Sequence, residues 1–591
     1  MKDNINKLNV KQIINIYGRV SKLLFSINRK YMIFLIIFTV LLGVFPSISI
    51  LLLQKIINEV QIEGISLSDV SIYISIYILI DIVTSIISNV LGYFSFKLKY
   101  LVSLVVNKKI LDKASELELA DFENSEVYNL IQRAQGQSGD KIYSYFIYLL
   151  SIGQSIITVI TSSYILFTWN MWVGPLIGVF SVIRSLIMVY FSKKQYLISR
   201  KRTTDERKKW YYQFLLTNDI AFKEIKLYNL SQYFIQKFES LFYKFIEEDN
   251  KLVKLRTIID SIISILDKTI VGGVFFLIIK AAISKVILVG DVIAYIRSMS
   301  SIKSNVESLL GQIVLLSGDT LYISEFFELL EFNSERKSVE NSIDIYCVES
   351  IKFNNVSYKY KESGKYVLKC INFEIKKGDL VAFVGRNGSG KSTLVKILSG
   401  FYDDYTGDVY INDINIRKIS KVSIRNQIGL LFQDFTKYEL TLRENIALGN
   451  LESSNDDNKI LRLLKENAFD EKSVPNIDNQ LGYWFQDGTQ LSGGQWMKVA
   501  LARTFIRDAS LYILDEPNAS LDNISEKRIL QKFKNLSKDK VSIFITHRLT
   551  SSKDVANKII LMDKGEIIKI GIHEDLINTS SLYKELYNEG Q

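Results

Sequence analysis

The chain has 591 residues, more than one hydrophobic core accommodates, and this length leaves room for roughly two to four domains. Hydrophobic residues make up 48% of it and charged residues 23%, an average that indicates an apolar part joined to a soluble part rather than one soluble domain. The net charge is +10, but much of the basic excess before residue 260 flanks apolar runs, as in SKKQYLISRKR at 192–202. Such flanks are typical of the cytoplasmic side of membrane spans, so we expect no nucleic-acid partner.

The N-terminal half contains the apolar stretches. Residues 1–30 are polar and basic, and no small-residue cleavage pattern follows, so we expect an uncleaved cytoplasmic segment there. A helix of about 20 apolar residues crosses a bilayer. Six stretches qualify, at 31–53, 70–94, 143–167, 171–191, 257–279 and, most weakly, roughly 291–316. The sequence therefore predicts an α-helical transmembrane domain of six spans at 31–330.

The gaps between these stretches differ in length. Those after the second and fourth stretches run to about 50 and 65 residues and are rich in Lys, Arg and Glu, whereas the other three are short. Applying the positive-inside rule to the long gaps places them, together with both termini, in the cytoplasm. At about 1.5 Å per residue they are long enough for helical hairpins that extend well beyond the bilayer.

Charged residues within the predicted spans are candidates for a substrate path. Asp260 and Asp267 lie seven positions apart in the fifth span, hence on one helix face. Two interpretations stay open: these side chains line the path of a cationic or polar peptide, or they form ion pairs between helices. Lys303 and Glu307, four apart in the sixth span, are expected to pair within their own helix. The second and fourth spans each hold a further charge of this kind, Asp81 and Arg184.

The composition changes after the sixth stretch. The polar run EFNSERKSVENS begins at Glu331 and indicates a linker and domain start at 331–350. Short apolar strands then alternate with helical stretches, which predicts one α/β domain with a parallel-sheet core at 351–591. The two cysteines of this soluble half, Cys347 and Cys370, lack metal-ligand spacing and indicate a reduced, cytosolic setting.

A phosphate-binding loop lies in this second half. LVAFVGRNGSGKST has the G-x-x-x-x-G-K-[ST] spacing between an apolar strand and a helical stretch, so backbone N–H groups would surround the phosphates of ATP. Lys391 would reach the β- and γ-phosphate oxygens, and Ser392 would ligate Mg²⁺. The predicted nucleotide-binding residues here are Gly385, Arg386, Asn387, Gly388, Ser389, Gly390, Lys391, Ser392 and Thr393.

Three more apolar strands end in polar residues. LYILDEP ends in Asp515, a candidate Mg²⁺ ligand, and Glu516, a candidate general base for water. The alternative is that these acids merely end a strand at a turn. Gln433 follows IGLLF and could contact both metal and water, and His547, one of only 2 histidines, follows SIFIT. A lone histidine is more often structural, but four strands ending in such groups indicate one site, in which His547 would contact the γ-phosphate.

At this point the sequence resembles a family. SGGQ at 492–495, ASLD at 519–522 and His547, in this order around LYILDEP, resemble the ATPase domain of ATP-binding cassette (ABC) transporters, and the preceding spans resemble the exporter type. The resemblance implies that Tyr360, with Tyr358 as a competitor, stacks on adenine. It also implies that the signature residues Ser492, Gly493, Gly494 and Gln495, with Asp522, complete the ATP site of a second subunit. We therefore expect a homodimer with composite ATP sites.

A narrower resemblance concerns the cargo. FTKYELTLRENIALG, LGYWFQDGTQLSGGQW and FKEIKLYNLSQYFIQKF (222–238) resemble the nisin-type lantibiotic transporters, which implies ATP-driven export of a modified peptide across the bacterial cytoplasmic membrane. An exporter of lipid or hydrophobic drugs is the alternative. No cysteine precedes Cys347 and no histidine precedes His547, so we expect no papain-like leader peptidase. Membrane lipid is an expected partner, and docking of peptide-modifying enzymes stays open.

Two further segments resemble contact regions of this family. LADFENSEVYNLIQRA (119–134) and NDIAFKEIKLYNL (218–230) resemble the tips of its cytoplasmic hairpins, whose short helices are implied to contact the ATPase domains. GYWFQDGTQ departs from the family pattern, because it replaces a loop that usually carries glutamate and arginine just before the signature.

Overall fold

The structure is a computed structural model, and it describes most of the chain. The described residues are 10–61, 67–219, 221–332, 342–360, 364–467, 476–517, 521–547, 553 and 555–589. They form two compact units, of which the first comprises Met1–Leu117 and Asn124–Phe332 and the second Glu118–Glu123 and Asn333–Gln591. The border at Phe332 falls within the predicted linker, of which 333–341 lies outside the described residues.

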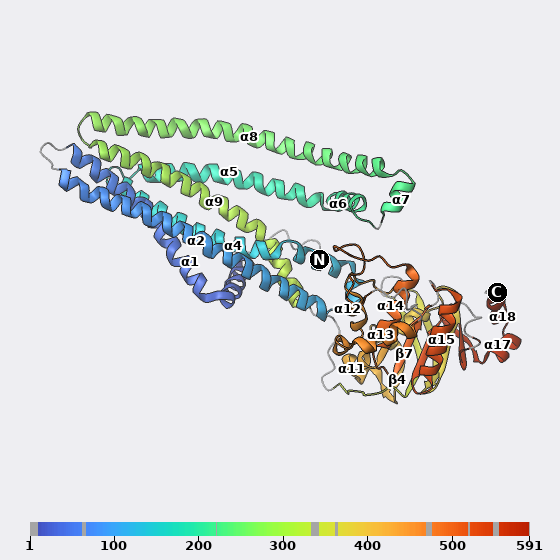
Figure 1. Ribbon diagram of the computed structural model, residues 1–591. Helices are drawn as coiled ribbons and strands as arrows, with labels where there is room; N and C mark the ends of the chain where they lie inside the picture. Colours follow the sequence, from blue (N-terminus) through green and yellow to red (C-terminus); the bar gives the residue numbers. More distant parts are fainter. Residues whose placement is uncertain are drawn as a thin grey trace. The chain divides into compact units, whose positions relative to one another are not determined.

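The first unit, the membrane unit, consists of helices, most of them long (Figure 1). They are α1 (Val10–Val60), α2 (Leu67–Glu116), α4 (Ser125–Phe167), α5 (Val173–Lys201), α6 (Thr203–Thr217), α7 (Phe222–Leu227), α8 (Ser231–Ile283) and α9 (Val289–Glu331). The helices around both long gaps continue far past the apolar stretches, and α8 alone has 53 residues. The prediction of helical hairpins is thereby confirmed.

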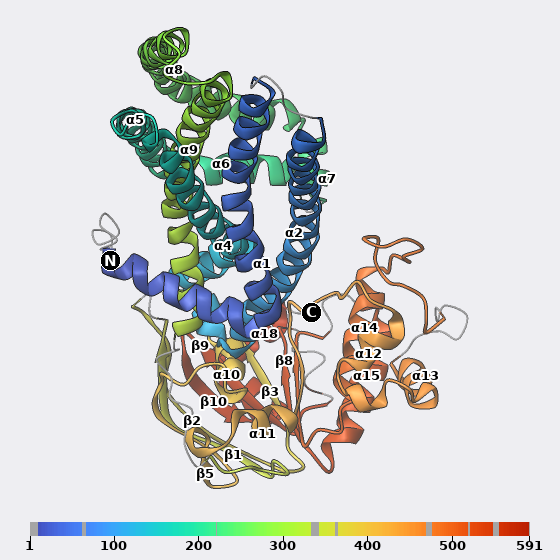
Figure 2. The ribbon, with the colours of Figure 1, turned by 90° about the vertical axis from the view of Figure 1, so that its left-hand side faces the viewer.

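Helix α1 is two helices joined at Asn28. The backbone of Asn28 is non-helical, with φ −157° and ψ 94°, and its side-chain Oδ1 accepts a hydrogen bond from the backbone N–H of Tyr31 at 3.1 Å. This is how asparagine caps a helix N-terminus, and it begins a new helix where the first apolar stretch begins. In Figure 2 the segment before Asn28 accordingly runs at an angle to the rest of α1.

Five described helices are long and apolar enough to cross a membrane. They contain the segments Asn15–Val60, Val70–Glu116, Gly139–Phe167, Val173–Gln195 and Ser231–Ile283. Helix α9, the predicted sixth span, is not among them, because Arg297, Lys303 and Glu307 interrupt its apolar residues. It is nevertheless a continuous helix that packs extensively against α4. The count of six spans therefore stays a prediction.

Neighbouring helices supply partners for polar groups at the start of α9. The carboxylate of Asp291 accepts hydrogen bonds from Gln54 Nε2 at 2.8 Å and Asn58 Nδ2 at 2.7 Å, both on α1. The same carboxylate accepts from the backbone N–H of Leu288 at 2.9 Å and so caps the helix. A polar helix end is stable inside a helical bundle when its groups are satisfied in this way.

The charges predicted within the spans form ion pairs between helices. Arg184 on α5 contacts Glu307 on α9 at 2.8 Å and Asp260 on α8 at 3.2 Å, and Lys303 on α9 pairs with Asp267 on α8. The expected pair within α9 between Lys303 and Glu307 is wrong, since each side chain finds an opposite charge on another helix. The contacts are those of the ion-pair interpretation. A role of these residues in a substrate path stays a prediction.

The second unit, the ATPase unit, contains the predicted parallel sheet. Its strand order is β10 (Glu566–Gly571), β9 (Lys558–Asp563), β3 (Leu380–Gly385), β8 (Val541–Ile545), β7 (Leu511–Asp515) and β6 (Ile428–Leu431). All neighbours pair in parallel except β10, which is antiparallel to β9. A second, antiparallel sheet has the order β2 (Tyr366–Lys376), β1 (Ser350–Lys359), β4 (Thr406–Ile411) and β5 (Ile414–Asn415).

Two hydrophobic cores cover the faces of the parallel sheet. Along β3, Ala382 and Val384 belong to one core, while Val381 and Phe383 belong to the other, as strand geometry requires. The first core also contains residues of α12 (Leu442–Ala447), α13 (Asp457–Glu466), α14 (Gly493–Phe505), α15 (Asn523–Ser537), α17 (His573–Thr579) and α18 (Ser581–Glu589). The second contains the antiparallel sheet, α10 (Lys391–Leu398) and α11 (Lys421–Asn426), and α3 (Leu119–Phe122) packs against it.

Candidate ATP site

Four strand ends bring the predicted catalytic residues to one edge of the parallel sheet. Strands β3, β8, β7 and β6 are consecutive neighbours and run in the same direction. Their carboxyl ends lead respectively to the phosphate loop, His547, the pair Asp515 and Glu516, and Gln433. Ligand sites of open parallel sheets lie at such edges.

The phosphate loop has the predicted strand, loop and helix. Lys391 begins α10 and is buried, with 6% of its surface exposed. Its ammonium donates hydrogen bonds to the carbonyl oxygens of Gly385 at 2.9 Å and Arg386 at 3.0 Å and to Ser389 Oγ at 3.1 Å. Burial lowers the pKa of Lys391 to about 8, against the opposing charges of Glu516 and Asp515. A buried cation at the N-terminus of a helix is suited to bind phosphate.

Only glycine fits the position before Lys391. Gly390 has φ +100° and precedes the first turn of α10. A Cβ atom there would lie 2.6 Å from Leu368 Cδ2 and 2.9 Å from the carbonyl oxygen of Val367. The glycine therefore combines a left-handed backbone with a close approach of β2.

Asp515 has the environment of a metal ligand. It is 3% exposed, and its Oδ1 is buried without a hydrogen-bond partner among the described residues. Burial raises the pKa of Asp515 to about 6, although Ser392 donates a hydrogen bond to the carboxylate. A carboxylate oxygen and a serine hydroxyl are oxygen ligands of the kind that Mg²⁺ prefers, so these residues fit the ion.

Replacing Asp515 with asparagine is expected to stabilise the ATPase unit in the absence of Mg²⁺ and nucleotide. The rise of this pKa from 3.8 to about 6 corresponds to about 3 kcal/mol. Because the folded-state pKa is raised, the carboxylate destabilises the fold above pH 6, and the cost vanishes as the pH falls toward 4. Thermal unfolding of the full chain at pH 8 and pH 5 measures this effect, and the gain at pH 5 should be roughly half of that at pH 8, because pH 5 lies between the unfolded and folded pKa values.

The control for this prediction is Asp508→Asn, because the Asp508 side chain is 90% exposed. It should change the unfolding temperature at neither pH. A gain for Asp515→Asn that is equal at both pH values would contradict an ionised, buried carboxylate.

Glu516 lies between two of the other predicted catalytic residues. Its Oε2 accepts a hydrogen bond from Gln433 Nε2 at 2.8 Å, and its Oε1 lies 2.5 Å from His547 Nε2. Its backbone is left-handed, with φ +49°, a costly conformation for a residue other than glycine that concentrates at functional sites. Burial and the charge of Lys391 lower the pKa of His547, so a neutral imidazole donates to the carboxylate at neutral pH. Gln433, Glu516 and His547 thus form one hydrogen-bonded group.

The signature serine caps a helix. Ser492 precedes α14, its Oγ accepts from the backbone N–H of Gln495 at 3.3 Å, and Gln495 Oε1 accepts from the backbone N–H of Ser492 at 2.8 Å. Asp522 similarly caps α15 by accepting from the N–H groups of Ile524 and Ser525. Ala519 and Ser520 of the predicted ASLD motif lie outside the described residues.

The aromatic residues near the phosphate loop divide into core and surface. Tyr358 is 4% exposed and stacks on Tyr402, with ring centroids 5.1 Å apart. Tyr360 is only partly buried, packs edge to face against Tyr402 at 5.8 Å, and its hydroxyl lies 3.1 Å from Thr393 Oγ1. Tyr360 is therefore the better placed of the two to offer a ring face to adenine.

Sequence reasoning missed the residues that hold α3 in the ATPase unit. Glu118 contacts Lys421 at 3.0 Å and Arg425 at 3.2 Å. Burial opposes ionisation of Glu118, but these two cations outweigh it and lower its pKa. Glu123 accepts a hydrogen bond of 2.8 Å from the hydroxyl of Tyr402, a residue with 0% exposure. The only signal in the sequence was the resemblance of 119–134 to a contact region.

Replacing Tyr402 with phenylalanine is expected to loosen α3. The variant loses a hydrogen bond from a buried hydroxyl to a carboxylate, which is worth about 1.5–3 kcal/mol. Amide hydrogen exchange in Leu119–Phe122 of the full chain should therefore become about 10- to 100-fold faster. Tyr405→Phe is the matched control, because the Tyr405 hydroxyl is buried without a partner among the described residues. Equal exchange rates in the two variants would contradict the assigned role.

The loop that departs from the family pattern is held by one acid. The carboxylate of Glu439 accepts hydrogen bonds from the backbone N–H groups of Tyr483 at 2.9 Å and Trp484 at 3.2 Å. The side chains of Tyr483, Trp484 and Phe485 are between 52% and 68% exposed. Glu439 thus fixes the backbone and leaves three aromatic side chains in contact with solvent.

Comparisons with known proteins identify the family of the chain. The family description "ABC transporter" matches residues 368–519. The subtilin transport ATP-binding protein SpaT of Bacillus subtilis is 37% identical over 98% of this chain and 95% of its own. The nisin transport ATP-binding protein NisT of Lactococcus lactis is 36% identical over 96% of this chain and 95% of its own.

The fold also matches a solved structure. A bacterial Atm1-family ABC exporter with ATP bound superimposes with a TM-score of 0.76 and covers 95% of this chain and 98% of its own, at 20% identity. The strand ends, the phosphate loop and relatives that extend over both units lead to one conclusion. The chain belongs to the ABC transporter family and couples ATP hydrolysis in its ATPase unit to transport through its membrane helices.

Proposed function

We propose that this chain exports a lantibiotic-type modified peptide across the bacterial cytoplasmic membrane. The observation that carries this proposal is the extent of two similarities, since SpaT and NisT match 98% and 96% of the chain, including the membrane helices. An ATP-dependent lipid A-core flippase of Coxiella burnetii matches 62% of it at 31% identity. Because cargo contacts the membrane helices, similarity throughout them supports a peptide cargo over a lipid.

The roles of the ATP-site residues follow from their positions. Lys391 would hold the β- and γ-phosphates, and Ser392, Asp515 and Gln433 would hold Mg²⁺, which neutralises charge on the phosphates when bound. Glu516 would accept a proton from the attacking water, and His547 would contact the γ-phosphate. Support comes from the hydrogen-bonded group of Gln433, Glu516 and His547 and from the unpartnered Oδ1 of Asp515.

Two copies of the chain would form the working transporter. Each chain has one phosphate loop and one signature, and the N-terminus of a signature helix can bind an anion held by another subunit. We propose a homodimer with two composite ATP sites and with both termini in the cytoplasm. Alternating access would follow from closure of the two ATPase units on ATP and reopening after hydrolysis.

Transport into sealed inside-out vesicles tests the cargo. Vesicles containing the full chain should accumulate a lanthionine-ringed peptide with ATP and Mg²⁺, and the peptide should raise the rate of ATP hydrolysis. The unmodified linear peptide and a fluorescent phospholipid are the controls. Accumulation of lipid or hydrophobic dye without the ringed peptide would instead favour the alternative cargo.

A further inference from the structure

A groove lies between α5 and α8 near the junction of α5 and α6. Its volume is about 490 Å³, within the range of sites that hold small molecules. Apolar side chains of Ile198, Leu252 and Leu255 line it together with the cations Lys194, Lys201 and Lys251. Two carboxylates also line it, but each pairs with a further lining cation, Asp205 with Lys244 and Glu248 with Arg202. The groove thus combines an apolar wall with a positively charged one.

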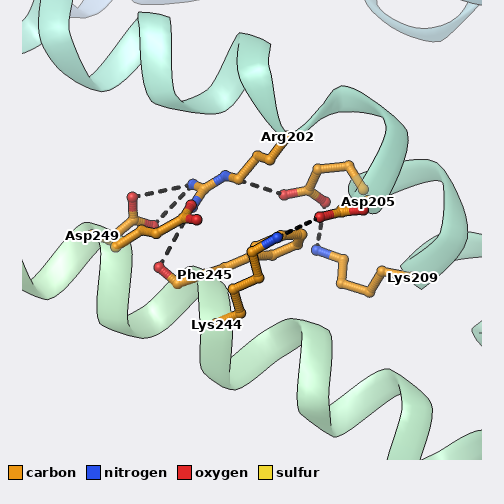
Figure 3. A network of polar contacts seen from close by, with 8 residues as sticks. Arg202, Asp205, Lys209, Lys244, Phe245 and Asp249 are labelled. Atoms are coloured by element: carbon orange, nitrogen blue, oxygen red, sulfur yellow. Dashed lines mark hydrogen bonds and ion pairs between the residues drawn. The ribbon is translucent and has the colours of Figure 1, made fainter.

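Arg202, which also lines the groove, joins the two helices. Figure 3 shows its guanidinium, which is 12% exposed, between the two helices, where it contacts both carboxylate oxygens of Asp249 at 3.2 and 2.9 Å. It also lies 4.8 Å from the centre of the Phe245 ring. Lys244 on α8 donates to Asp205 on α6 at 2.8 Å, which adds a second link. These contacts neutralise the charge of Arg202 and fix the distance between the helices. They therefore shape the groove, but they supply none of its unpaired positive charge.

The free charge comes from lysines on α5. Lys194 and Lys201 are exposed, seven positions apart and hence on one helix face. Neither makes an ion pair with any residue that the structure describes. On α8, Lys251 pairs with Glu247 at 2.8 Å, and both side chains are more than 70% exposed, so water weakens this pair. The groove therefore offers cations that a bound anion could use.

The groove lies at the depth of the lipid headgroups. The apolar segment of α5 ends at Gln195, next to Lys194, and Lys201 lies about 10 Å further along the helix axis at about 1.5 Å per residue. On α8, Lys251 and Leu255 directly precede the predicted span at 257–279. Headgroups occupy a layer roughly 5 to 8 Å thick outside the hydrocarbon core, so Lys194 lies at the inner border of this layer. The backbones of Lys201 and Lys251 lie just beyond it, and their long side chains can reach back to the headgroups. The apolar wall borders the acyl chains.

The topology assigns this end to the cytosolic leaflet. Helix α9 leads into the ATPase unit, which uses cytosolic ATP, so the end of α9 at Glu331 is cytosolic. Helices α8 and α9 are joined at their other end by the short segment 284–288. The beginning of α8, with Lys244 and Lys251, is therefore on the cytosolic side, in agreement with the orientation proposed above.

We propose that this groove binds an anionic phospholipid of the cytosolic leaflet, with its phosphate at Lys194, Lys201 and Lys251 and its acyl chains along Ile198, Leu252 and Leu255. The lysines match a phosphate, and the apolar residues match a diacyl chain rather than a free phosphate ion. A bound lipid would contact both α5 and α8, whichever cargo the transporter moves.

Lipid retention by matched double variants tests the site. The full chain is reconstituted in nanodiscs that contain equal amounts of phosphatidylglycerol and phosphatidylcholine. It is then released in mild detergent, and the lipid that remains bound is measured by native mass spectrometry. Lys194→Gln with Lys251→Gln removes one groove cation from each helix. Each lysine near an anionic surface is worth about a fivefold change in affinity, so retained phosphatidylglycerol should fall about 25-fold. Retained phosphatidylcholine should not change.

Lys193→Gln with Lys254→Gln is the matched control, because these exposed lysines lie on the same helices at the same depth but do not line the groove. It should keep phosphatidylglycerol, and both double variants should keep ATP hydrolysis. An equal loss of phosphatidylglycerol in the control would mean that general surface charge causes the effect, and the proposed lipid site would be wrong. Displacement of the lipid by glycerol phosphate would mean that the groove binds a free phosphate compound instead. Loss of dimers in the groove variant, with lipid retention unchanged, would mean that the groove contacts a second copy of the chain.

Discussion

The Glu516→Gln variant is expected to bind ATP with unchanged affinity and to hydrolyse it about 10²- to 10⁴-fold more slowly, the usual contribution of a general base. Glutamine has the same shape and cannot accept the proton of water. Both carboxylate oxygens of Glu516 are occupied, by Gln433 and His547, so one of these contacts must open before the carboxylate can reach water. The loss should therefore appear in kcat.

Phosphate release and nucleotide binding, measured on the same reconstituted protein, test this prediction. Glu452→Gln is the control, since Glu452 is an exposed acid in the short turn Leu451–Ser453. It should hydrolyse ATP at the wild-type rate. Turnover near the wild-type rate in Glu516→Gln would remove Glu516 as the base, whereas lost ATP affinity would place it in binding instead.

The second large effect concerns the signature. Ser492→Asp is expected to abolish hydrolysis, because a carboxylate would repel the γ-phosphate. Aspartate is also a good helix cap, as is threonine, so α14 should stay folded in Ser492→Asp and in the neutral control Ser492→Thr. The control should remain active. Circular dichroism of the two variants tests whether the helix cap is kept, and their ATP turnover tests whether the added negative charge abolishes hydrolysis.

Mixing two inactive chains tests whether the sites are composite. Lys391→Ala lacks the phosphate contact but has an intact signature, and Ser492→Asp has the reverse. In a mixed dimer one site combines the two intact halves, so co-expression in equal amounts should restore about a quarter of the wild-type activity. No restoration would mean that each chain completes its own site.

The sequence predicted which residues meet at one edge of the sheet, because these residues follow buried strands. In a parallel sheet the carboxyl ends of neighbouring strands share one edge, so Gln433, Asp515, Glu516 and His547 could be placed together without knowledge of side-chain positions. The signature serine was equally predictable, since a serine followed by glutamine three positions later is a capping pattern. The choice between Tyr358 and Tyr360 needed the structure, because it depends on which ring the core buries.

Contacts between distant helices were not predictable in the same way. Lys303 and Glu307 have the spacing of a pair within one helix, yet a pair between helices is better shielded from water and lipid, and Arg184 and Asp267 supply it. The rule that residues four positions apart can pair applies to an isolated helix and does not account for partners on neighbouring helices. The hydrogen bond between Glu123 and Tyr402 joins residues 279 positions apart, and no local pattern encodes it.

The location of α3 within the ATPase unit affects how the chain is built. Glu118–Glu123 are synthesised more than 200 residues before the rest of that unit, at a pace of roughly 5–20 residues per second. Helix α3, which is already attached to the membrane unit, can therefore make its contacts only after Tyr402, Lys421 and Arg425 have been synthesised. A separately produced ATPase domain would lack α3 and expose these side chains to water. Assembly of the two halves is thus part of the folding of the second one.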